Sequence, residues 1–528
     1  MFLTANIRLI LIVSVFITAT GNITLFHRLT EIYPLVEKWP FIIALMGFFT
    51  FSTMLFLIWT CFGKFSKWIL AIFLVTSAIA AYYMDQFGVV IDRDMIANTM
   101  ETNPQEFAGL VSIKMLIRVL LFGIVPSILI FKFDSKPSSF GRGLIVRLSL
   151  TALLVVLCII SILPFTADFA TFVREHKMTR MYANPLGFTY SVISYVKTQF
   201  KRQSVYVVKH TAEDAKKLFH TGNKKLIILV VGETARADRF SLNGYYKETN
   251  PELKKLNVVS FKNVSSCGTA TKISLPCMFS NLGRANYDEN QAFQQENALD
   301  VLSEHGVQVL WRGNNSDSKG VATRVPYQSF KSPTLNPVCD TECRDIGMLS
   351  GLDAYIKSHQ GKDILIVLHQ MGNHGPEYYR RYPENFRRFQ PMCMTGELGD
   401  CSKQEVDNAY DNAILYTDYF LANVINFLKQ YDEKYSTAML YVSDHGESLG
   451  EQGIYLHAAP YLIAPKAQTH IPVIIWTGKY FDYHFDDILP WQDYPLSQDD
   501  LFCTLLIAND IHSNKTCDSK QQSVSYTH

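Results

Sequence analysis

Apolar residues gather in the first third of the chain, in five runs that are long enough, or nearly so, to cross a lipid bilayer. A membrane-spanning helix needs about 20 apolar residues. The runs cover residues 9–26, 41–62, 68–84, 115–131 and 144–165, and no comparable run follows. This pattern predicts a transmembrane domain of five helices within residues 1–166.

Basic residues between these runs predict how the helices are oriented, because positively charged short loops stay in the cytoplasm. The residues concerned are Lys64, Lys67, Lys132, Lys136 and Arg142. With five spans, the amino terminus then lies inside and the chain after residue 165 lies outside. Arg8 and the small residues 18–20 also fit a cleaved signal peptide, but four further spans favour an uncleaved anchor.

Beyond residue 222 the apolar pattern changes from long runs to short ones that alternate with stretches of helical periodicity. The short runs are 225–231, 307–311, 363–369, 437–443 and 471–476. They predict a mostly parallel sheet covered by helices in residues 223–528. Residues 167–222 are polar and aromatic, and we expect them to form bridging helices beside the membrane or an ordinary linker helix.

A long amphipathic helix is expected on this sheet. Residues 405–430 carry apolar side chains at helical spacing, from Val406 to Phe427. The acidic residues between them, Asp407, Asp411 and Asp418, are expected on the solvated face.

Charge and cysteine content narrow the function. The 528 residues carry a net charge of +1, which argues against nucleic acid as the main partner. Eight of the ten cysteines fall in the part predicted to lie outside, which fits an oxidising compartment. Pairing of neighbours closes short loops, although the sequence alone leaves other connectivities open. The neighbours are Cys267 with Cys277, Cys339 with Cys343, Cys393 with Cys401 and Cys503 with Cys517.

Candidate metal ligands stand directly after two of the predicted strands. Glu233 follows the run 225–231, and Asp444 with His445 follows the run 437–443. Sheets of this class keep their active sites at the carboxyl ends of the strands. Carboxylate and imidazole are ligands that zinc takes, and a catalytic zinc keeps one position open for the reacting group. Each residue alone is more often a cap or an ion-pair partner, so the hypothesis depends on all three coming together.

The candidate nucleophile lies in a segment rich in hydroxyl groups, residues 265–274, which Cys267 within it and Cys277 just after it would hold. A metal ion can stabilise a threonine alkoxide and so make it a nucleophile at neutral pH. Thr271 or Thr269 would serve, and the alternative is an ordinary capping loop.

Three further residues have the chemistry to bind a phosphate or move a proton. His374 stands in a glycine-rich loop after the run 363–369, and His457 stands in another loop. Lys319 follows the run 307–311 and would compensate phosphate charge. Histidines and lysines in such loops are otherwise ordinary surface groups.

The outer loop before the fourth span carries polar residues at helical spacing. Asn98, Thr102 and Glu106 would share one face of a helix, although Pro104 weakens that helix. They would meet a lipid headgroup or only solvate the loop.

Several of these segments resemble the lipid A phosphoethanolamine transferases, a family that includes the mobile colistin-resistance enzymes. The likeness covers the whole chain and implies five spans followed by an alkaline-phosphatase-like (sulfatase-like) α/β domain outside the membrane. The segments are Val231-Gly-Glu-Thr-Ala-Arg236, Ser241-Leu-Asn-Gly-Tyr245, Cys267-Gly-Thr-Ala-Thr271 through Pro276-Cys-Met-Phe-Ser280, Asn314-Asn-Ser-Asp-Ser-Lys319 and Ser443-Asp-His-Gly-Glu-Ser448.

The resemblance also implies a role for each site residue. Zinc would be held by Glu233, Asp444, His445 and the nucleophile Thr271, which carries phosphoethanolamine as a covalent intermediate. Positions that would contact substrate phosphate or a second zinc are His374 and His457. Polar side chains that would flank the site are Lys319, Thr269, Asn315 and Ser316. Positions that would bind the headgroup are Asn98, Thr102 and Glu106.

The implied activity is transfer of phosphoethanolamine from phosphatidylethanolamine to a lipid A phosphate, with polymyxin resistance as its consequence. The resemblance places the protein, as a monomer, in a Gram-negative inner membrane with its catalytic domain in the periplasm. Alternatives are an acceptor on a core sugar or another glycan, a phosphoglycerol transferase, and an inactive membrane protein that only binds lipid or a partner. A sulfatase is less consistent with the sequence, because Met278 stands where that signature requires Arg.

Overall fold

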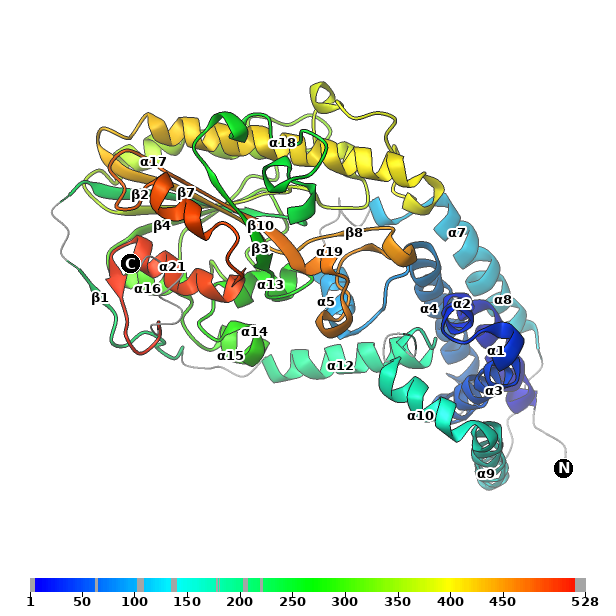
Figure 1. Ribbon diagram of the computed structural model, residues 1–528. Coiled ribbons are helices and arrows are strands. Elements are labelled where there is room, and N and C mark those ends of the chain that lie inside the picture. Colours follow the sequence, from blue (N-terminus) through cyan, green and yellow to red (C-terminus); the bar gives the residue numbers. More distant parts are fainter. Residues whose placement is uncertain are drawn as a thin grey trace. The chain divides into compact units, whose positions relative to one another are not determined.

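The computed structural model describes residues 5–61, 65–101, 109–133, 140–176, 179, 181–202, 208–218 and 222–517 (Figure 1). Lys64, Lys136, Thr102 and Glu106 lie outside these residues. The chain forms two compact units, one of residues 1–100 with 107–201 and one of residues 101–106 with 202–528. They are called here the helical unit and the sheet unit.

The helical unit contains four stretches that are long and apolar enough to span a membrane: Leu35–Thr60, Ser66–Phe87, Ile113–Lys132 and Gly143–Val173. A fifth span results only if two helices bent by 58° about Asn22 count as one. The helices are α1 (Ala5–Gly21), α2 (Ile23–Ile32), α3 (Leu35–Thr60), α4 (Ser66–Phe87), α5 (Arg93–Glu101), α7 (Ile113–Val119), η2 (Leu120–Ile124), α8 (Val125–Lys132), α9 (Phe140–Ile162), α10 (Thr166–Glu175) and α12 (Leu186–Arg202).

The bend at Asn22 has a cause in hydrogen bonding. The Asn22 side-chain amide donates to the carbonyls of Thr18, at 3.3 Å, and Asn184, at 2.8 Å, while its oxygen accepts from the Asn184 backbone at 2.7 Å. An asparagine that bonds nearby backbone groups competes with the helix. The composition of the first apolar run had suggested one continuous helix, but the run is bent at Asn22.

The sheet unit is built on eight strands in the order β11-β3-β10-β7-β2-β6-β4-β5. All five predicted strands are present, as β2 (Lys224–Gly232), β4 (Gln308–Gly313), β6 (Ile364–His369), β7 (Tyr435–Ser443) and β10 (His470–Thr477). The others are β3 (Val259–Ser265), β5 (Tyr327–Ser329) and β11 (Leu496–Ser497). The strands β7, β2, β6, β4 and β5 are parallel neighbours, whereas β10 runs antiparallel to β7 and β3.

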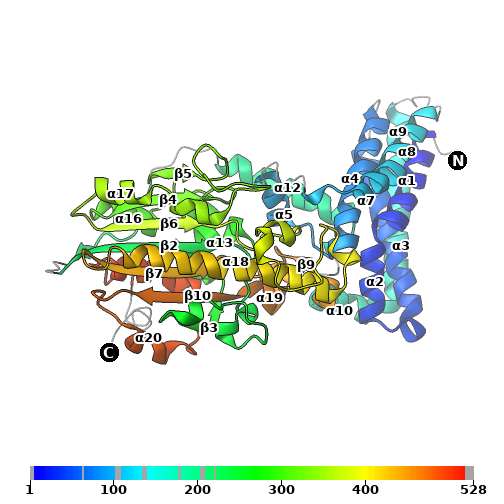
Figure 2. The same cartoon turned by 90° about the horizontal axis from the view of Figure 1, so that it is seen from above.

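Helices cover both faces of the sheet, with α18 (Lys403–Lys429) on one and α13 (Thr271–Met278), α16 (Ala298–Glu304) and α21 (Leu501–Ala508) on the other (Figures 1 and 2). β2 and β7 are buried along almost their whole length, as strands covered on two faces must be. Smaller elements are α14 (Gly283–Asn286), α15 (Glu289–Phe293), α17 (Leu352–Ser358), α19 (Lys466–Thr469), α20 (Phe485–Ile488) and the short strands β1 (Lys216–Lys217), β8 (Ser448–Leu449), β9 (Tyr455–Leu456) and β12 (Ile511–His512).

The helix predicted at 405–430 forms as α18, but two of its acidic residues are not solvated. Asp411 and Asp418 are fully buried. Asp411 accepts hydrogen bonds from Lys247 at 2.6 Å and Tyr245 at 2.9 Å, and Asp418 accepts from the backbone of Glu252 and Leu253. The segment 237–256 covers this face, so the expectation of a solvated face was wrong for these two residues.

The eight cysteines of the sheet unit pair as neighbours. The disulfides are Cys267–Cys277, Cys339–Cys343, Cys393–Cys401 and Cys503–Cys517.

Candidate active site

The three candidate ligands meet at the carboxyl ends of β2 and β7. Gly232 and Ser443 are paired across these strands, so Glu233 and Asp444 leave the sheet side by side. Glu233, Asp444 and His445 are fully buried, and one ligand atom from each lies within 4.8 Å of the others. His445 Nε2 is 3.5 Å from Glu233 Oε1 and 3.4 Å from Asp444 Oδ2. The register of two parallel strands thus assembles the cluster.

The structure separates the two candidate nucleophiles. Thr271 opens α13, and its Oγ1 lies 3.2 Å from each carboxylate oxygen of Glu233 and 3.3 Å from His445 Nε2. Thr269 Oγ1 instead donates to the Ala459 carbonyl at 2.6 Å. Thr271 is therefore the hydroxyl at the ligand cluster, and Thr269 holds the loop that carries His457.

Hydrogen bonds orient the ligands toward a common centre. The contact of 2.8 Å between His445 Nδ1 and the Gly446 carbonyl places the ring proton on Nδ1, which leaves the Nε2 lone pair facing the cluster. Asp444 Oδ1 accepts from the backbone N–H groups of Thr234 and His445, at 3.1 and 2.7 Å. Asp444 Oδ2 is buried and has no hydrogen-bond donor among the described residues.

The electrostatics of this cluster suit a divalent cation. Burial raises the pKa of Asp444 to about 6 and lowers the pKa of His445 well below its ordinary value. Two buried carboxylates beside a neutral imidazole are costly without a compensating charge. The donor set and the unsatisfied Asp444 Oδ2 fit a zinc ion, which would be held by Glu233, Asp444 and His445.

Asn315 and Gly372 fix the position of Glu233, the first by a hydrogen bond and the second by close packing. The Asn315 amide donates to Glu233 Oε2 at 2.6 Å and to the Gln370 carbonyl at 2.8 Å, and the Ser316 N–H donates to Asn315 Oδ1 at 2.5 Å. A Cβ on Gly372 would lie 2.9–3.1 Å from atoms of Glu233, and Gly372 has a φ of +52°. Only glycine fits this close approach without strain.

His374 and His457 join the same site. The His457 ring centroid lies 4.5 Å from that of His445 and 5.8 Å from that of His374. His457 Nδ1 is 2.8 Å from Glu447 Oε2, and Glu447 Oε1 accepts from the Tyr378 hydroxyl at 2.7 Å. Glu447 is fully buried and was missed by the sequence analysis, although it stands in the same segment as Asp444 and His445.

Lys319 is buried in the loop that follows β4, and its Nζ lies 3.7 Å from Asp317 Oδ1. Burial, and then the charge of Lys319, lower the pKa of His369, the last residue of β6, to about 3. Lys319 thus brings positive charge beside a neutral buried histidine that the sequence analysis did not single out.

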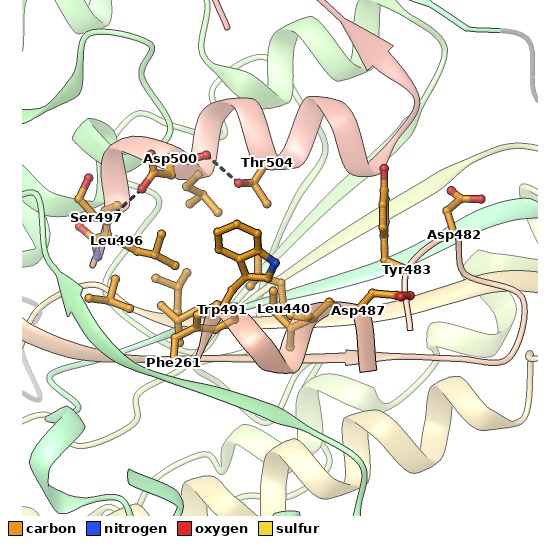
Figure 3. A pocket seen from close by; sticks show the side chains of 17 residues that line it. Phe261, Leu440, Asp482, Tyr483, Asp487, Trp491, Leu496, Ser497, Asp500 and Thr504 are labelled. Carbon is orange, nitrogen blue, oxygen red and sulfur yellow. Dashed lines mark hydrogen bonds between the residues drawn. The ribbon is translucent and has the colours of Figure 1, made fainter. Parts of the chain in front are cut away.

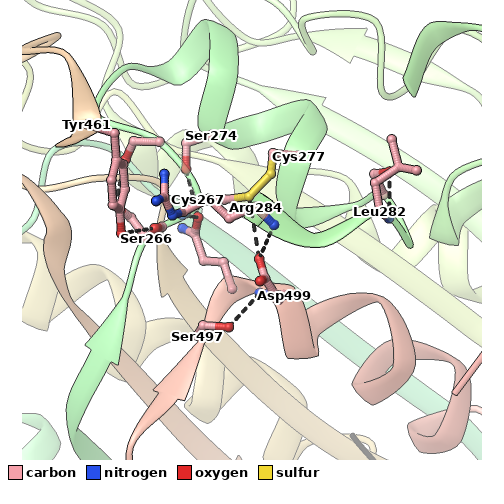
Figure 4. The surroundings of a disulfide bond; sticks show 12 residues. Ser266, Cys267, Ser274, Cys277, Leu282, Arg284, Tyr461, Ser497 and Asp499 are labelled. Atoms are coloured by element: carbon pink, nitrogen blue, oxygen red, sulfur yellow. Dashed lines mark hydrogen bonds between the residues drawn. A yellow bond between two sulfur atoms is a disulfide. The ribbon is translucent and has the colours of Figure 1, made fainter. Parts of the chain in front are cut away.

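A clamp built from distant segments fixes the start of α13. The Cys267–Cys277 disulfide joins the preceding loop to the helix (Figure 4). Gln498 Oε1 accepts from the Cys267 N–H at 2.6 Å and the Ser274 hydroxyl at 2.7 Å, while its amide donates to the carbonyls of Ser443 and Asp444 at 2.6 and 2.8 Å. No signal in the sequence pointed to Gln498. The Ser274 hydroxyl also donates to the Asp444 carbonyl, so it ties α13 to the segment that carries two of the candidate ligands.

The proposed headgroup residues belong to another part of the chain. Asn98 lies in α5, whereas Thr102 and Glu106 fall outside the described residues. Their expected role stays a prediction.

Comparison with known proteins gives matches along almost the entire chain. A family model described as "Sulfatase" matches residues 225–511, and one described as "Phosphoethanolamine transferase EptA/EptB" matches residues 49–200. The chain is 41% identical over 523 residues to phosphatidylethanolamine transferase Mcr-1 of Escherichia coli, covering 96% of this chain and 95% of that one.

Solved structures agree with these matches. The integral membrane lipooligosaccharide phosphoethanolamine transferase A of Neisseria meningitidis superposes with a TM-score of 0.93 at 32% identity, over 97% of each chain. The C-terminal periplasmic domain of phosphoethanolamine transferase EptC from Campylobacter jejuni matches 58% of this chain and 94% of its own, at 45% identity and a TM-score of 0.52.

Proposed function

Because the chain belongs to the family of membrane phosphoethanolamine transferases, we propose that it transfers phosphoethanolamine from phosphatidylethanolamine to a lipid A phosphate through a covalent intermediate on Thr271. The observation that carries this proposal is the position of Thr271 Oγ1, within 3.3 Å of both Glu233 and His445. A hydroxyl so placed among metal-ligand side chains is suited to nucleophilic attack.

Zinc is the proposed cofactor, and it would supply the positive charge that favours the Thr271 alkoxide and offsets charge developing on phosphate oxygens. Glu233, Asp444 and His445 would hold it. His374 and His457 would bind substrate phosphate or a second zinc ion. Lys319, Thr269, Asn315 and Ser316 would complete the polar surroundings, and Asn98, Thr102 and Glu106 would meet the headgroup.

The proposed reaction has two displacements at phosphorus. In the first, Thr271 Oγ1 forms a bond to the phosphorus of phosphatidylethanolamine, the bond to the diacylglycerol oxygen breaks, and the Thr271 proton ends on that oxygen. In the second, a lipid A phosphate oxygen attacks the same phosphorus, and Thr271 leaves and regains a proton. His457, which Glu447 holds through Nδ1, is oriented to bind phosphate oxygens or pass the proton.

The proposed setting is the inner membrane of a Gram-negative bacterium. Five spans, with the bent α1–α2 pair as the first, would place the sheet unit in the periplasm as part of a monomer. Adding an ammonium group to an anionic lipid surface weakens its attraction for cationic peptides, so polymyxin resistance would follow.

Mass spectrometry of lipid A from a susceptible Gram-negative host expressing the full chain tests this proposal. Wild type should add a phosphoethanolamine group, Thr271→Ala should not, and the exposed-site control Thr323→Ala should behave as wild type. An increment on core sugar but not on lipid A would overturn the proposed acceptor. An increment that survives Thr271→Ala would overturn the proposed nucleophile.

A further inference from the structure

A second cavity lies in the sheet unit, on the face of the sheet that α21 covers. Its volume is about 360 Å³, within the range of small-molecule sites. Apolar side chains of three neighbouring strands line it, and Trp491 projects into it (Figure 3). These strand residues are Phe261, Val264, Leu440, Val442, Val473 and Ile475.

The charged side chains that line this cavity are all acidic. Three aspartates line it, Asp482, Asp487 and Asp500, and no lysine or arginine is among its lining residues. Lys225, near the start of the central strand β2, compensates Asp482, with its Nζ on Asp482 Oδ2. Asp487 and Asp500 each accept a backbone N–H, from His484 at 2.8 Å and Ser497 at 3.0 Å, and burial raises the pKa of Asp500. These acidic groups would therefore favour a positively charged ligand in the cavity.

We propose that this cavity binds a small organic ammonium ion with an apolar body, which would lie on the strand side chains while its charge meets Asp487. An apolar body alone would gain from burial but would make no charge interaction with Asp487. An anion of the same shape would be repelled. None of Glu233, Asp444 and His445 lines this cavity, although Gln498, which donates to the carbonyls of Ser443 and Asp444, does. The existence of the cavity does not depend on the proposed transfer.

Three probes of one shape test this site on the full chain in detergent: phenethylamine, 2-phenylethanol and phenylacetate. The amine should raise the thermal unfolding midpoint and bind at least threefold more tightly than the alcohol, and the acid should not bind. Equal binding of all three, or no binding of the amine, would overturn the proposal.

Variants assign the binding to this cavity. Leu440→Trp should fill the cavity and abolish binding, whereas Val338→Trp, at an exposed position elsewhere, should not. Asp487→Asn keeps the side-chain shape and should reduce the preference for amine over alcohol. Binding that survives Leu440→Trp in a folded protein would show that the amine binds at another place.

A different observation concerns Gln498, whose four hydrogen bonds join the segment around Thr271 to the residues Ser443 and Asp444 at the end of β7. The amide oxygen of Gln498 accepts from Cys267 and Ser274, on the Thr271 side, and its nitrogen donates to the carbonyls of Ser443 and Asp444. We infer that Gln498 is a positioning residue that sets the distance between Thr271 and the metal ligands. This inference rests on the proposed transfer at Thr271.

Gln498→Glu tests it, because a carboxylate of the same size would face the carbonyls of Ser443 and Asp444. In a reconstituted assay kcat should fall at least tenfold while KM for phosphatidylethanolamine stays within twofold of wild type, and Gln492→Ala should match wild type. Unchanged kcat would overturn the inference. An inactive wild type would instead contradict the proposed function. In that case zinc binding would test Gln498 alone. The zinc dissociation constants of wild type and Gln498→Glu are expected to differ at least threefold.

Discussion

Two of the regions of the sheet unit that bury aspartates are helix α18 and the end of β7, and of these two only the end of β7 has the geometry of an active site. On α18, Asp411 lies against Arg239 and Lys247, and Asp418 accepts two backbone N–H groups. At the end of β7, Asp444 Oδ2 has no donor among the described residues and faces His445 Nε2. Burial raises the pKa in all three cases. A raised pKa therefore marks burial. An oxygen without a hydrogen-bond donor does not identify the site either, because Asp411 Oδ1 also has none among the described residues. What marks the site is the convergence of Glu233, Asp444 and His445 beside Thr271.

The largest expected difference between the two regions is in activity. Asp444→Asn should lower phosphoethanolamine transfer on the order of a thousandfold and remove bound zinc, because a ligand is lost. Lipid A mass spectrometry and metal analysis of the purified chain measure both. Asp411→Asn is the matched control, and a similar loss of activity in that folded variant would erase the distinction between the regions.

Asp411→Asn should instead affect stability. Removing the carboxylate takes the acidic partner at 2.6 Å from Lys247 and leaves Arg239 with Asp407. Breaking a buried ion pair costs about 3–5 kcal/mol, so the loss should lie at or below this range. Thermal unfolding in detergent should show a clear drop in the midpoint, with the transfer rate of the folded protein retained. An unchanged midpoint would mean that the ion pairs contribute little.

Asp418 should make stability depend on pH. Burial raises its pKa to about 7 in the folded protein, above an unfolded value near 3.8. The folded state thus binds more protons, so this contribution is fully present below about pH 4 and is lost as pH rises through 7. The gain in unfolding midpoint given by Asp418→Asn should be larger at pH 8 than at pH 5. A gain independent of pH would contradict the raised pKa.

The smallest expected effect comes from replacing glycines, and it separates the cost of backbone strain from the cost of crowding against Glu233. Gly372→Ala adds a Cβ against Glu233, whereas Gly361 has a similar positive φ, +79°, with open space around it. Each substitution should cost about 1–2 kcal/mol from its backbone conformation. Only Gly372→Ala should also reduce transfer, by about tenfold if Glu233 shifts. Equal activities of the two variants would show that the contact with Glu233 is not critical.

Much of the site could be predicted because its residues follow strands that the apolar pattern reveals. Glu233, Asp444 and His445 each stand just beyond such a run, and parallel neighbours end at the same edge. The bend at Asn22 could not be predicted, because Asn184, its partner, is 162 residues away. The burial of Asp411 and Asp418 depended likewise on the segment 237–256, which the helical pattern of α18 cannot reveal.

The sequence by itself determined the apolar runs, the ligand types at the strand ends and the cysteines available for pairing, because these depend on local composition and spacing. Only the tertiary structure decided that Thr271 rather than Thr269 meets the cluster, that Glu447 holds His457, and that Gln498 joins the segment around Thr271 to the end of β7. Each of these depends on the direction of a side chain toward a distant segment. Hydrogen bonds act over about 3 Å, so they are decided only once the sheet has brought those segments together.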